Sequence, residues 1–245
     1  MSTILITGCS SGFGADIARF FLDRDWHVIA TMRAPNPEAL PASDRLRILP
    51  LDITNAGSIR AALAEAGPID VLVNNAGIGW LNALEGTPMD TVREIFETNT
   101  LGTIAMTQAV LPQFRERRAG VIVNVSSAVT QQPLHLLAVY TASKAAVNAF
   151  TASLALELEP FGIRAHVVNP GRAPDTRFGE NARARMAAFP EAYQALAQQV
   201  FARWQTETLV TKPREVSEVV WRVATDPAAP RMLPAGADAV ALAAE

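Results

Sequence analysis

The chain has 245 residues, 49% of them hydrophobic, which is enough apolar material for one large core. Its formal net charge of −3 at pH 7 gives no basic field for a nucleic acid, so we expect no nucleic-acid partner. The one cysteine, Cys9, excludes an internal disulfide framework, and three widely spaced histidines form no zinc pattern.

The ends and apolar runs of the chain predict a cytoplasmic protein without a membrane anchor. Ser2 leads directly into the apolar stretch Ile4–Ile6, without the basic region that opens a signal peptide. No run of about 18 apolar residues, the length that spans a bilayer, occurs in the sequence. A reducing compartment and metal-free chemistry agree with the cysteine and histidine counts.

Short apolar runs alternate with segments of helical period along most of the chain. Such runs, without strict polar alternation, are typical of strands buried on both faces of a parallel sheet. The fold class predicted is therefore α/β, a doubly wound parallel sheet with helices on both faces, in a single domain over 1–245. The predicted strands are 3–7, 28–31, 47–51, 70–73, 120–125 and 164–168, and the flanking helices include 16–24 and 58–65.

Two long helices are predicted in the middle of the chain, over 88–117 and 138–159, and Pro112 should distort or end the first. Residues 172–212 depart from the strand and helix rhythm, and combine apolar residues at helical spacing with several arginines. This segment suits either an amphipathic helix pair that forms a lid over a site, or plain core packing.

A glycine-rich turn, Thr7 to Gly14, lies between the first strand and the first helix. Its glycines permit positive φ angles, and the free N–H groups of the helix start offer a site for a pyrophosphate. The spacing Gly-x-x-x-Gly-x-Gly differs both from the Gly-x-Gly-x-x-Gly fingerprint and from the P-loop. Nucleotide binding is predicted from the strand, turn, helix context, with a purely structural turn as the alternative.

The segment from Tyr140 to Lys144 carries a phenol and an ammonium group one helical turn apart. Residues i and i+4 of a helix share a face, and a nearby cation lowers the pKa of a tyrosine. The pair is therefore a candidate proton donor, although any solvated helix face can carry such a pair.

The motifs taken together resemble those of the short-chain dehydrogenase/reductase family of about 250 residues. The residues that carry the resemblance, closely as far as residue 171, are Thr7, Gly8, Gly12, Gly14, Asp52, Asn74 to Gly77, Asn99, Ser127, Tyr140, Lys144, Pro170 and Gly171. The resemblance implies a Rossmann-type fold and an NAD(P)-dependent enzyme that interconverts a ketone or aldehyde with an alcohol.

The resemblance also implies residue roles. Tyr140 matches the family's general acid and base, Lys144 the lysine that binds the nicotinamide ribose and lowers the tyrosine pKa, Ser127 the serine that binds the substrate oxygen, and Asn99 the asparagine that holds a relay water. Tyr140 and Lys144 also count among the cofactor-binding residues. The other positions predicted to bind the cofactor are Gly8, Ser10, Ser11, Gly12, Phe13, Gly14, Arg33, Asp52, Ile53, Asn75, Ala76, Gly77, Pro170, Gly171 and Thr176.

The end of the second strand predicts the cofactor. Members specific for NAD carry an acidic residue there, but this chain has Met32 followed by Arg33, and a guanidinium suits the 2′-phosphate of NADP. NADP(H) is therefore predicted to be preferred, with NAD(H) possible. The alternative is that Arg33 is a solvated loop residue, and Ser11 stands where some NADP-preferring members carry a second basic residue.

The loop after Gly171 departs from the family pattern. The family's threonine position, five residues after the proline, holds Asp175, so Thr176 is the residue carried over. Residues 131–136, Trp80 and segment 172–212 are expected to line a mostly apolar substrate side, which favours an uncharged, moderately bulky carbonyl or alcohol substrate. The long middle helices carry apolar faces, so a homodimer or homotetramer is expected.

Two other functions fit the same fold. A nucleotide-binding sensor or scaffold without catalysis is one alternative, although such proteins usually lack the tyrosine or the lysine. A dehydratase or epimerase is another, but these relatives tend to have a longer C-terminal region. The retained Tyr140 and Lys144 favour an oxidoreductase.

Overall fold

The computed structural model describes residues 2–244, and in this part of the chain seven parallel strands form one sheet. The strands lie in the order β3-β2-β1-β4-β5-β6-β7, which is the doubly wound order predicted. Their bounds are β1 (Thr3–Ile6), β2 (His27–Met32), β3 (Leu46–Pro50), β4 (Val71–Asn74), β5 (Gly120–Val125), β6 (Ile163–Pro170) and β7 (Met232–Ala235).

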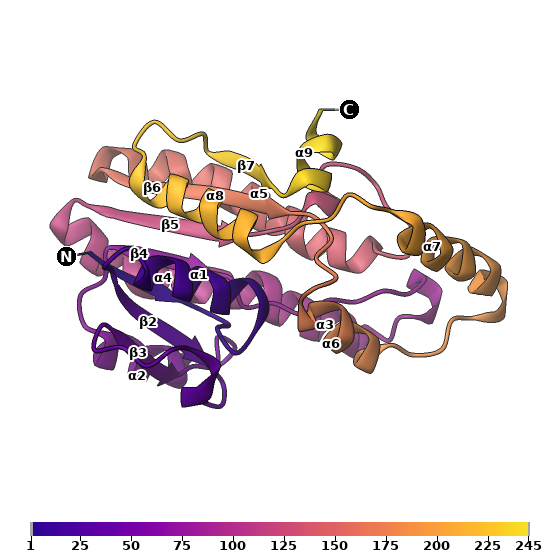
Figure 1. Ribbon diagram of the computed structural model, residues 1–245, viewed down its shortest axis with the longest axis horizontal. Coiled ribbons are helices and arrows are strands. Elements are labelled where there is room, and N and C mark those ends of the chain that lie inside the picture. The colour runs from indigo at the N-terminus through magenta and orange to yellow at the C-terminus, as the bar shows by residue number, and fades with distance from the viewer. Residues whose placement is uncertain (1, 245) are drawn as a thin grey trace.

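Helices cover both faces of this sheet (Figure 1). The helices are α1 (Gly12–Leu22), α2 (Ala56–Ala66), α3 (Met89–Phe96), α4 (Gly102–Arg117), α5 (Ala138–Leu158), α6 (Arg177–Arg185), α7 (Gln194–Thr206), α8 (Pro213–Thr225) and α9 (Ala237–Ala243). Successive residues of a strand point to opposite faces, so Ile4 and Ile6 pack with α1 and α8, while Leu5 packs with α2, α4 and α5. Both faces of β1 are therefore buried, which explains its continuous apolar sequence.

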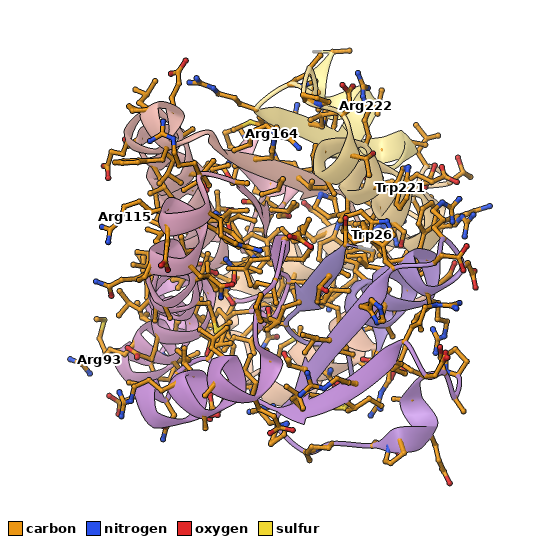
Figure 2. The ribbon with its side chains drawn as sticks, turned by 90° about the vertical axis from the view of Figure 1, so that its left-hand side faces the viewer. Trp26, Arg93, Arg115, Arg164, Trp221 and Arg222 are labelled. Atoms are coloured by element: carbon orange, nitrogen blue, oxygen red, sulfur yellow. The ribbon has the colours of Figure 1, made fainter. Side chains whose placement is uncertain are left out.

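An aromatic cluster joins α1 to α8. Phe21 packs edge-on against Trp26 and Trp221, with ring centroids 5.0 and 5.2 Å away. Figure 2 shows Trp26 and Trp221 near one another, whereas Arg93 and Arg115 point outward. This cluster fixes α8 against the first βαβ unit.

Two expectations about helices and strands need correction. The helix predicted over 88–117 runs without a break through α3, the π-helical turn η3 (Glu97–Leu101) and α4, so only its hydrogen-bonding pattern changes in the middle, and it continues through the exposed Pro112 to Arg117 instead of ending there. Strand β7 was not predicted. It is short, contains Pro234 and pairs only with β6, and proline is tolerated at such a sheet edge.

The strand order reverses between β1 and β4, and ligands of doubly wound sheets bind at the carboxyl ends of the strands beside this point. The glycine turn follows β1, and residues 75–77 follow β4. Helices α6 and α7, orange in Figure 1, lie beyond the carboxyl ends of the strands. The glycine turn and residues 75–77 are therefore brought together where a nucleotide would bind.

Close packing at this point predicts a large cost for a side chain at Gly8. Gly8 has φ +75°, and an added Cβ would lie 2.8 Å from the Ala76 Cα atom. Gly8→Ala should lower the free energy of unfolding by about 3 kcal/mol, because left-handed strain adds to a backbone clash. Gly67 has φ +73° with no atom within 4 Å of an added Cβ, so Gly67→Ala should cost only about 1 kcal/mol. Urea unfolding of both variants measures the difference, and equal losses would contradict the clash.

Candidate active site

The glycine turn is fixed to the end of β4 by side-chain hydrogen bonds. The Asn75 amide donates to the backbone oxygens of Thr7 (2.9 Å) and Gly8 (3.2 Å), and the backbone N–H groups of Asn75 and Ala76 donate to Thr7 Oγ1 at 3.0 and 2.9 Å. A Cβ on Gly14 would collide with the Gly8 carbonyl. The turn is held in shape by protein contacts alone.

The N-terminus of α1 has no side-chain cap. Ser11 precedes the helix with extended backbone angles, and its side chain accepts no capping hydrogen bond from the helix N–H groups. Gly12, at φ +59°, starts the helix, and Ser10 beside it is exposed. These free N–H groups and the positive end of the helix dipole form a setting that suits a phosphate.

The Asn74 side chain links β4 to the elements around it. Its amide donates to Asn124 Oδ1 on the neighbouring strand (2.9 Å) and to Thr107 Oγ1 on α4 (3.0 Å). Asn124 in turn donates to Thr151 Oγ1 on α5 at 2.8 Å. This buried polar chain fixes α4 and α5 on the sheet.

Asn99 lies in the π-helical turn η3 and is fully enclosed. Its side-chain oxygen accepts from the Ile78 N–H at 2.8 Å, and its amide donates to the Ile78 oxygen (2.9 Å) and to Ser143 Oγ (3.1 Å). An added Cβ on Gly77 would lie 3.1 Å from Asn99 Oδ1 and 3.5 Å from Lys144 Nζ. The backbone at Gly77 therefore passes directly beside Asn99 and Lys144.

The predicted catalytic side chains gather at the carboxyl ends of β4 and β5. Ser127 follows β5, and Tyr140 and Lys144 lie in the first two turns of α5, all three buried. The Ser127 side chain lies close enough to the Tyr140 phenol to act on its pKa. Ser126 points elsewhere, since its hydroxyl donates to the Lys144 carbonyl at 3.2 Å.

Burial shifts the pKa values of both Tyr140 and Lys144. Burial raises the pKa of Tyr140 to about 12, with the hydrogen bond to Ser127 opposing the rise. Burial lowers the pKa of Lys144 to about 8, and its Nζ donates to the Val125 carbonyl at 2.9 Å. The pKa of Tyr140 therefore lies above its usual value, whereas the neighbouring cation was expected to bring it below, because desolvation of the phenol is the largest effect.

Arg33 and Asp52 lie at the ends of neighbouring strands. Met32 is buried, whereas Arg33 is exposed and its charge helps to lower the pKa of Asp52. The main cause of that lowered pKa is the Thr54 N–H, which donates to the Asp52 carboxylate at 2.9 Å, followed by the Thr54 hydroxyl at 2.7 Å. Ile53 is buried against Gly102 at the start of α4.

The segment after β6 is closed at its two ends. Thr211 donates its N–H to the Arg172 oxygen (2.8 Å), and its hydroxyl oxygen accepts from the Gly171 N–H (2.9 Å). Asp238 accepts from the Arg172 N–H and the Thr211 hydroxyl, both at 2.6 Å. Pro170 ends β6 beside this group. Nothing in the sequence motifs singled out Asp238 or Thr211.

Thr176 lies against the glycine turn. It is buried, its hydroxyl donates to the Ala173 oxygen at 2.9 Å, and its Cβ would lie 3.4 Å from a Cβ added to Gly12. Phe13, in the first turn of α1, is partly buried against the core. The loop 172–176 thus passes over the start of α1.

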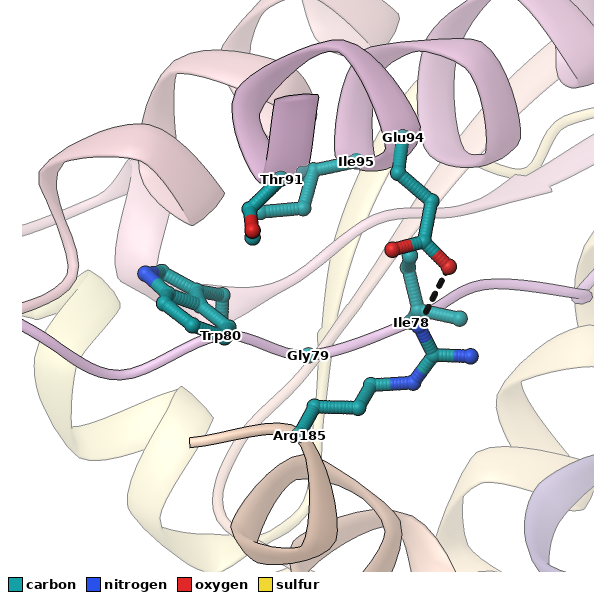
Figure 3. Close-up of a pocket in the computed structure, with 7 residues that line it drawn as sticks. All are labelled: Ile78, Gly79, Trp80, Thr91, Glu94, Ile95 and Arg185. Atoms are coloured by element: carbon teal, nitrogen blue, oxygen red, sulfur yellow. Dashed lines mark hydrogen bonds and ion pairs between the residues drawn. The ribbon is translucent and has the colours of Figure 1, made fainter. Parts of the chain in front are cut away.

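Helix α6 covers Tyr140. The ring centroid of Phe178 lies 6.0 Å from that of Tyr140, and Phe178 also packs against Gly79, where an added Cβ would be 2.8 Å away. At the other end of α6, Arg185 forms an ion pair with Glu94 of α3 beside a small cavity of about 140 Å³ (Figure 3). The sequence motifs gave no signal for Phe178 as a neighbour of Tyr140.

Helix α7 packs through an apolar cluster on the loops beside the site. The cluster is formed by Leu81, Ala83, Leu136, Leu137, Met186, Phe189, Tyr193, Leu196, Ala197, Val200, Phe201 and Trp204. Its members come from the loops after β4 and β5 and from segment 172–212. Apolar contacts therefore join α7 to these loops.

No group of three or more His, Cys, Asp or Glu side chains within residues 2–244 is placed to hold a metal ion. No helix in this range is long and apolar enough to cross a membrane.

Comparisons with known proteins agree with the geometry. A family model described as short chain dehydrogenase matches residues 2–187. The uncharacterized oxidoreductase YusZ of Bacillus subtilis is 34% identical over 235 residues, covering 90% of this chain and 84% of that protein.

Solved structures are similar over almost the whole chain. A short-chain dehydrogenase from Streptomyces avermitilis has a TM-score of 0.85 at 34% identity, covering 99% of this chain and 90% of its own. A serine dehydrogenase complexed with NADP+ has a TM-score of 0.81 at 31% identity, and the match covers 95% of this chain and 93% of the dehydrogenase chain. A 3-ketoacyl-(acyl-carrier-protein) reductase from Brucella melitensis complexed with NADH has a TM-score of 0.78 at 26% identity. This match covers 95% of this chain and 96% of the reductase chain.

Proposed function

The chain belongs to the short-chain dehydrogenase family, an oxidoreductase family with nicotinamide cofactors, and from this premise we propose that it is an NADP(H)-dependent carbonyl reductase or alcohol dehydrogenase. The observation that carries the proposal is the buried group of Ser127, Tyr140 and Lys144, in which Ser127 lies beside the Tyr140 phenol and Lys144 lies on the next turn of the same helix. Two neighbouring hydroxyls that can both donate hydrogen bonds suit a carbonyl oxygen.

The residues of the site fit a dinucleotide. The uncapped start of α1, from Ser11 to Phe13, suits the pyrophosphate, and the exposed Ser10 lies beside it. Gly8, Gly14, Asn75 and Ala76 hold this turn in shape. Asp52, Ile53, Gly77, Pro170, Gly171 and Thr176 would line the rest of the cofactor site. When bound, the nicotinamide supplies a hydride to the carbonyl carbon.

In carbonyl reduction, Ser127 and Tyr140 donate hydrogen bonds to the substrate oxygen as negative charge develops there. A Tyr140 phenol with a pKa of about 12 is fully protonated at neutral pH, so it is ready to give its proton to that oxygen. Lys144, whose pKa is about 8, is mainly cationic at pH 7 and favours the phenolate that results. Asn99 is proposed to hold the water that returns a proton through Lys144.

We propose an uncharged, moderately bulky ketone or aldehyde as the substrate. The apolar cluster under α7 and the Phe178 ring beside Tyr140 support this choice, because a charged substrate would lose its hydration there without a partner. Segment 172–212 is proposed to act as a lid, because α6 covers Tyr140. A panel of ketones, aldehydes and alcohols assayed with NADPH and NADP+ by nicotinamide absorbance tests the proposal, and no turnover of any compound would contradict it.

The preference for NADP(H) rests on Arg33. Its guanidinium is exposed at the end of β2, with no hydrogen bond or ion pair to another described residue, and is free to bind a 2′-phosphate. Arg33→Asp should lower the ratio of kcat/KM for NADPH to that for NADH by about 100-fold, since a charge-assisted contact is lost and a repulsion is added. Arg115→Asp, on the outward-facing end of α4 (Figure 2), is the matched control and should leave the ratio unchanged. An unchanged ratio in Arg33→Asp would exclude the phosphate contact.

We also propose a cytoplasmic homodimer or homotetramer. Leu101 at the start of α4 and Leu156 on α5 are 50% and 60% exposed, which supports an interface on these helices. Light scattering of the purified protein measures the assembly, and a monomer at micromolar concentration would contradict it.

A further inference from the structure

A side chain farther along α5 reaches the loop that carries Ser127. Asn148 lies one turn beyond Lys144 and two turns beyond Tyr140, on the same face of the helix. Its Nδ2 donates to Thr130 Oγ1 at 2.9 Å. The helix that supplies the tyrosine and the lysine therefore also contacts the 3-10 turn η4 (Ala128–Thr130) that follows Ser127.

Thr130, which accepts the hydrogen bond from Asn148, is itself bonded to Ser127. Its hydroxyl donates to the Ser127 carbonyl at 2.8 Å, and its backbone N–H donates to the same oxygen at 3.2 Å. The Ser127 side chain is then free to accept from the Val129 N–H, at a long 3.4 Å, and to bond the Tyr140 hydroxyl. Two donors from Thr130 thus hold the backbone from which the Ser127 hydroxyl projects.

We propose that Thr130 and Asn148 are positioning residues, which fix the Ser127 hydroxyl relative to the Tyr140 hydroxyl through the hydrogen-bonded series Asn148, Thr130, Ser127. The inference rests on the proposed reduction of a carbonyl by Ser127 and Tyr140. The physical reason is that both hydroxyls must point at one oxygen, and a displacement of about 1 Å can cost a large factor in rate. Asn148 connects the loop that carries Ser127 to the helix that carries Tyr140. The positions of the Ser127 and Tyr140 hydroxyls relative to each other are thereby fixed.

The hydrogen-bonding capacity of Asn148 is only partly used. The Asn148 amide oxygen is buried without a hydrogen-bond partner, so the side chain is only partly satisfied where it lies. Replacing both partners of a buried hydrogen bond by apolar groups of similar shape is close to neutral for stability. The double variant Thr130→Val with Asn148→Leu should therefore keep the melting temperature of the wild type while it loses activity.

The activity test uses the best carbonyl substrate of the panel with NADPH. Thr130→Val, Asn148→Leu and the double variant should each lower kcat by about tenfold, with the NADPH Kd unchanged. Thr130→Ser should restore most of kcat because it keeps the hydroxyl. Thr225→Val removes a similar threonine hydroxyl, which donates to the Trp221 carbonyl on α8, and is the control that should keep full activity.

Coupling to Ser127 separates positioning from a general structural effect. In a Ser127→Ala background, Thr130→Val should cause no further loss of kcat, because the hydroxyl that it positions is already absent. A further tenfold loss in that background, or full activity in Thr130→Val, would overturn the inference. If Ser127→Ala itself keeps full activity, the proposed function fails instead.

A second readout needs neither cofactor nor substrate. The chain has only two tyrosines, so protein labelled with ¹³C at the tyrosine Cζ atoms gives two NMR signals, which Tyr193→Phe assigns. Ser127→Ala should shift the Tyr140 signal, because the phenol loses its hydrogen bond. Thr130→Val should shift it in the same direction and Thr130→Ser should not. An unmoved signal in Thr130→Val would overturn the inference whatever the substrate is.

Discussion

Replacing Tyr140 with phenylalanine should lower kcat for carbonyl reduction by about 10²- to 10⁴-fold, the range contributed by a positioned general acid. The ring still fills its place between α5 and Phe178, and the change removes the proton donor and one of two hydrogen bonds to the substrate oxygen. The Kd for NADPH, measured by fluorescence titration, should stay within a factor of about two.

Tyr193→Phe is the matched control, because Tyr193 is the only other tyrosine and belongs to the apolar cluster under α7. It should keep kcat within a factor of about two, since it removes a hydroxyl remote from the proton transfer. Reductase activity that survived in Tyr140→Phe would exclude the proposed acid, and a matching loss in Tyr193→Phe would point to a general effect of tyrosine removal.

Replacing Lys144 with methionine should abolish most of the activity and at the same time stabilise the protein at neutral pH. Burial holds the pKa of Lys144 at about 8, below its ordinary value of 10.5, so the folded state carries a charge that it binds poorly. Removing that charge should raise the free energy of unfolding by about 2 kcal/mol at pH 7, after the lost hydrogen bond to the Val125 carbonyl is counted. The kcat for reduction should fall by about 100-fold.

The pH dependence of stability has a definite sign. Between about pH 8 and pH 10.5 the unfolded chain binds a proton at Lys144 that the folded chain has released. The contribution of Lys144 therefore makes the protein more stable as pH rises through this window, and the gain is lost as pH falls to 8. Urea unfolding at pH 7.5, 8.5 and 9.5 should show the Lys144→Met advantage shrinking. An advantage that is absent, or that grows with pH, would contradict the buried charge.

Those parts of the fold and site that depend on local patterns could be predicted from the sequence. Strands buried on both faces, such as β1, leave continuous apolar runs, and the glycine turn and the Tyr140 and Lys144 spacing are short motifs with a fixed geometry. The sheet order and family membership agree with that prediction.

What the sequence did not predict depends on tertiary contacts. The π-helical turn around Asn99 cannot be recognised from the spacing of apolar residues in the sequence. The Asn99 side chain is oriented by hydrogen bonds to Ile78 and Ser143. Phe178 reaches Tyr140 from a distant part of the chain, past a glycine that permits close approach. The raised pKa of Tyr140 follows from burial, whereas the sequence showed only a neighbouring cation.

The hydrogen bond between Arg172 and Thr211 means that the chain leaves the scaffold and returns to it at a single point. Asp238 holds both residues there, so residues 173–210 form an excursion with a fixed base. Such an excursion is a natural unit for grafting: exchanging 177–210, which keeps Thr176 against the glycine turn, for the equivalent stretch of a relative should transfer selectivity between substrates. We expect that selectivity and scaffold in this chain can be re-engineered separately.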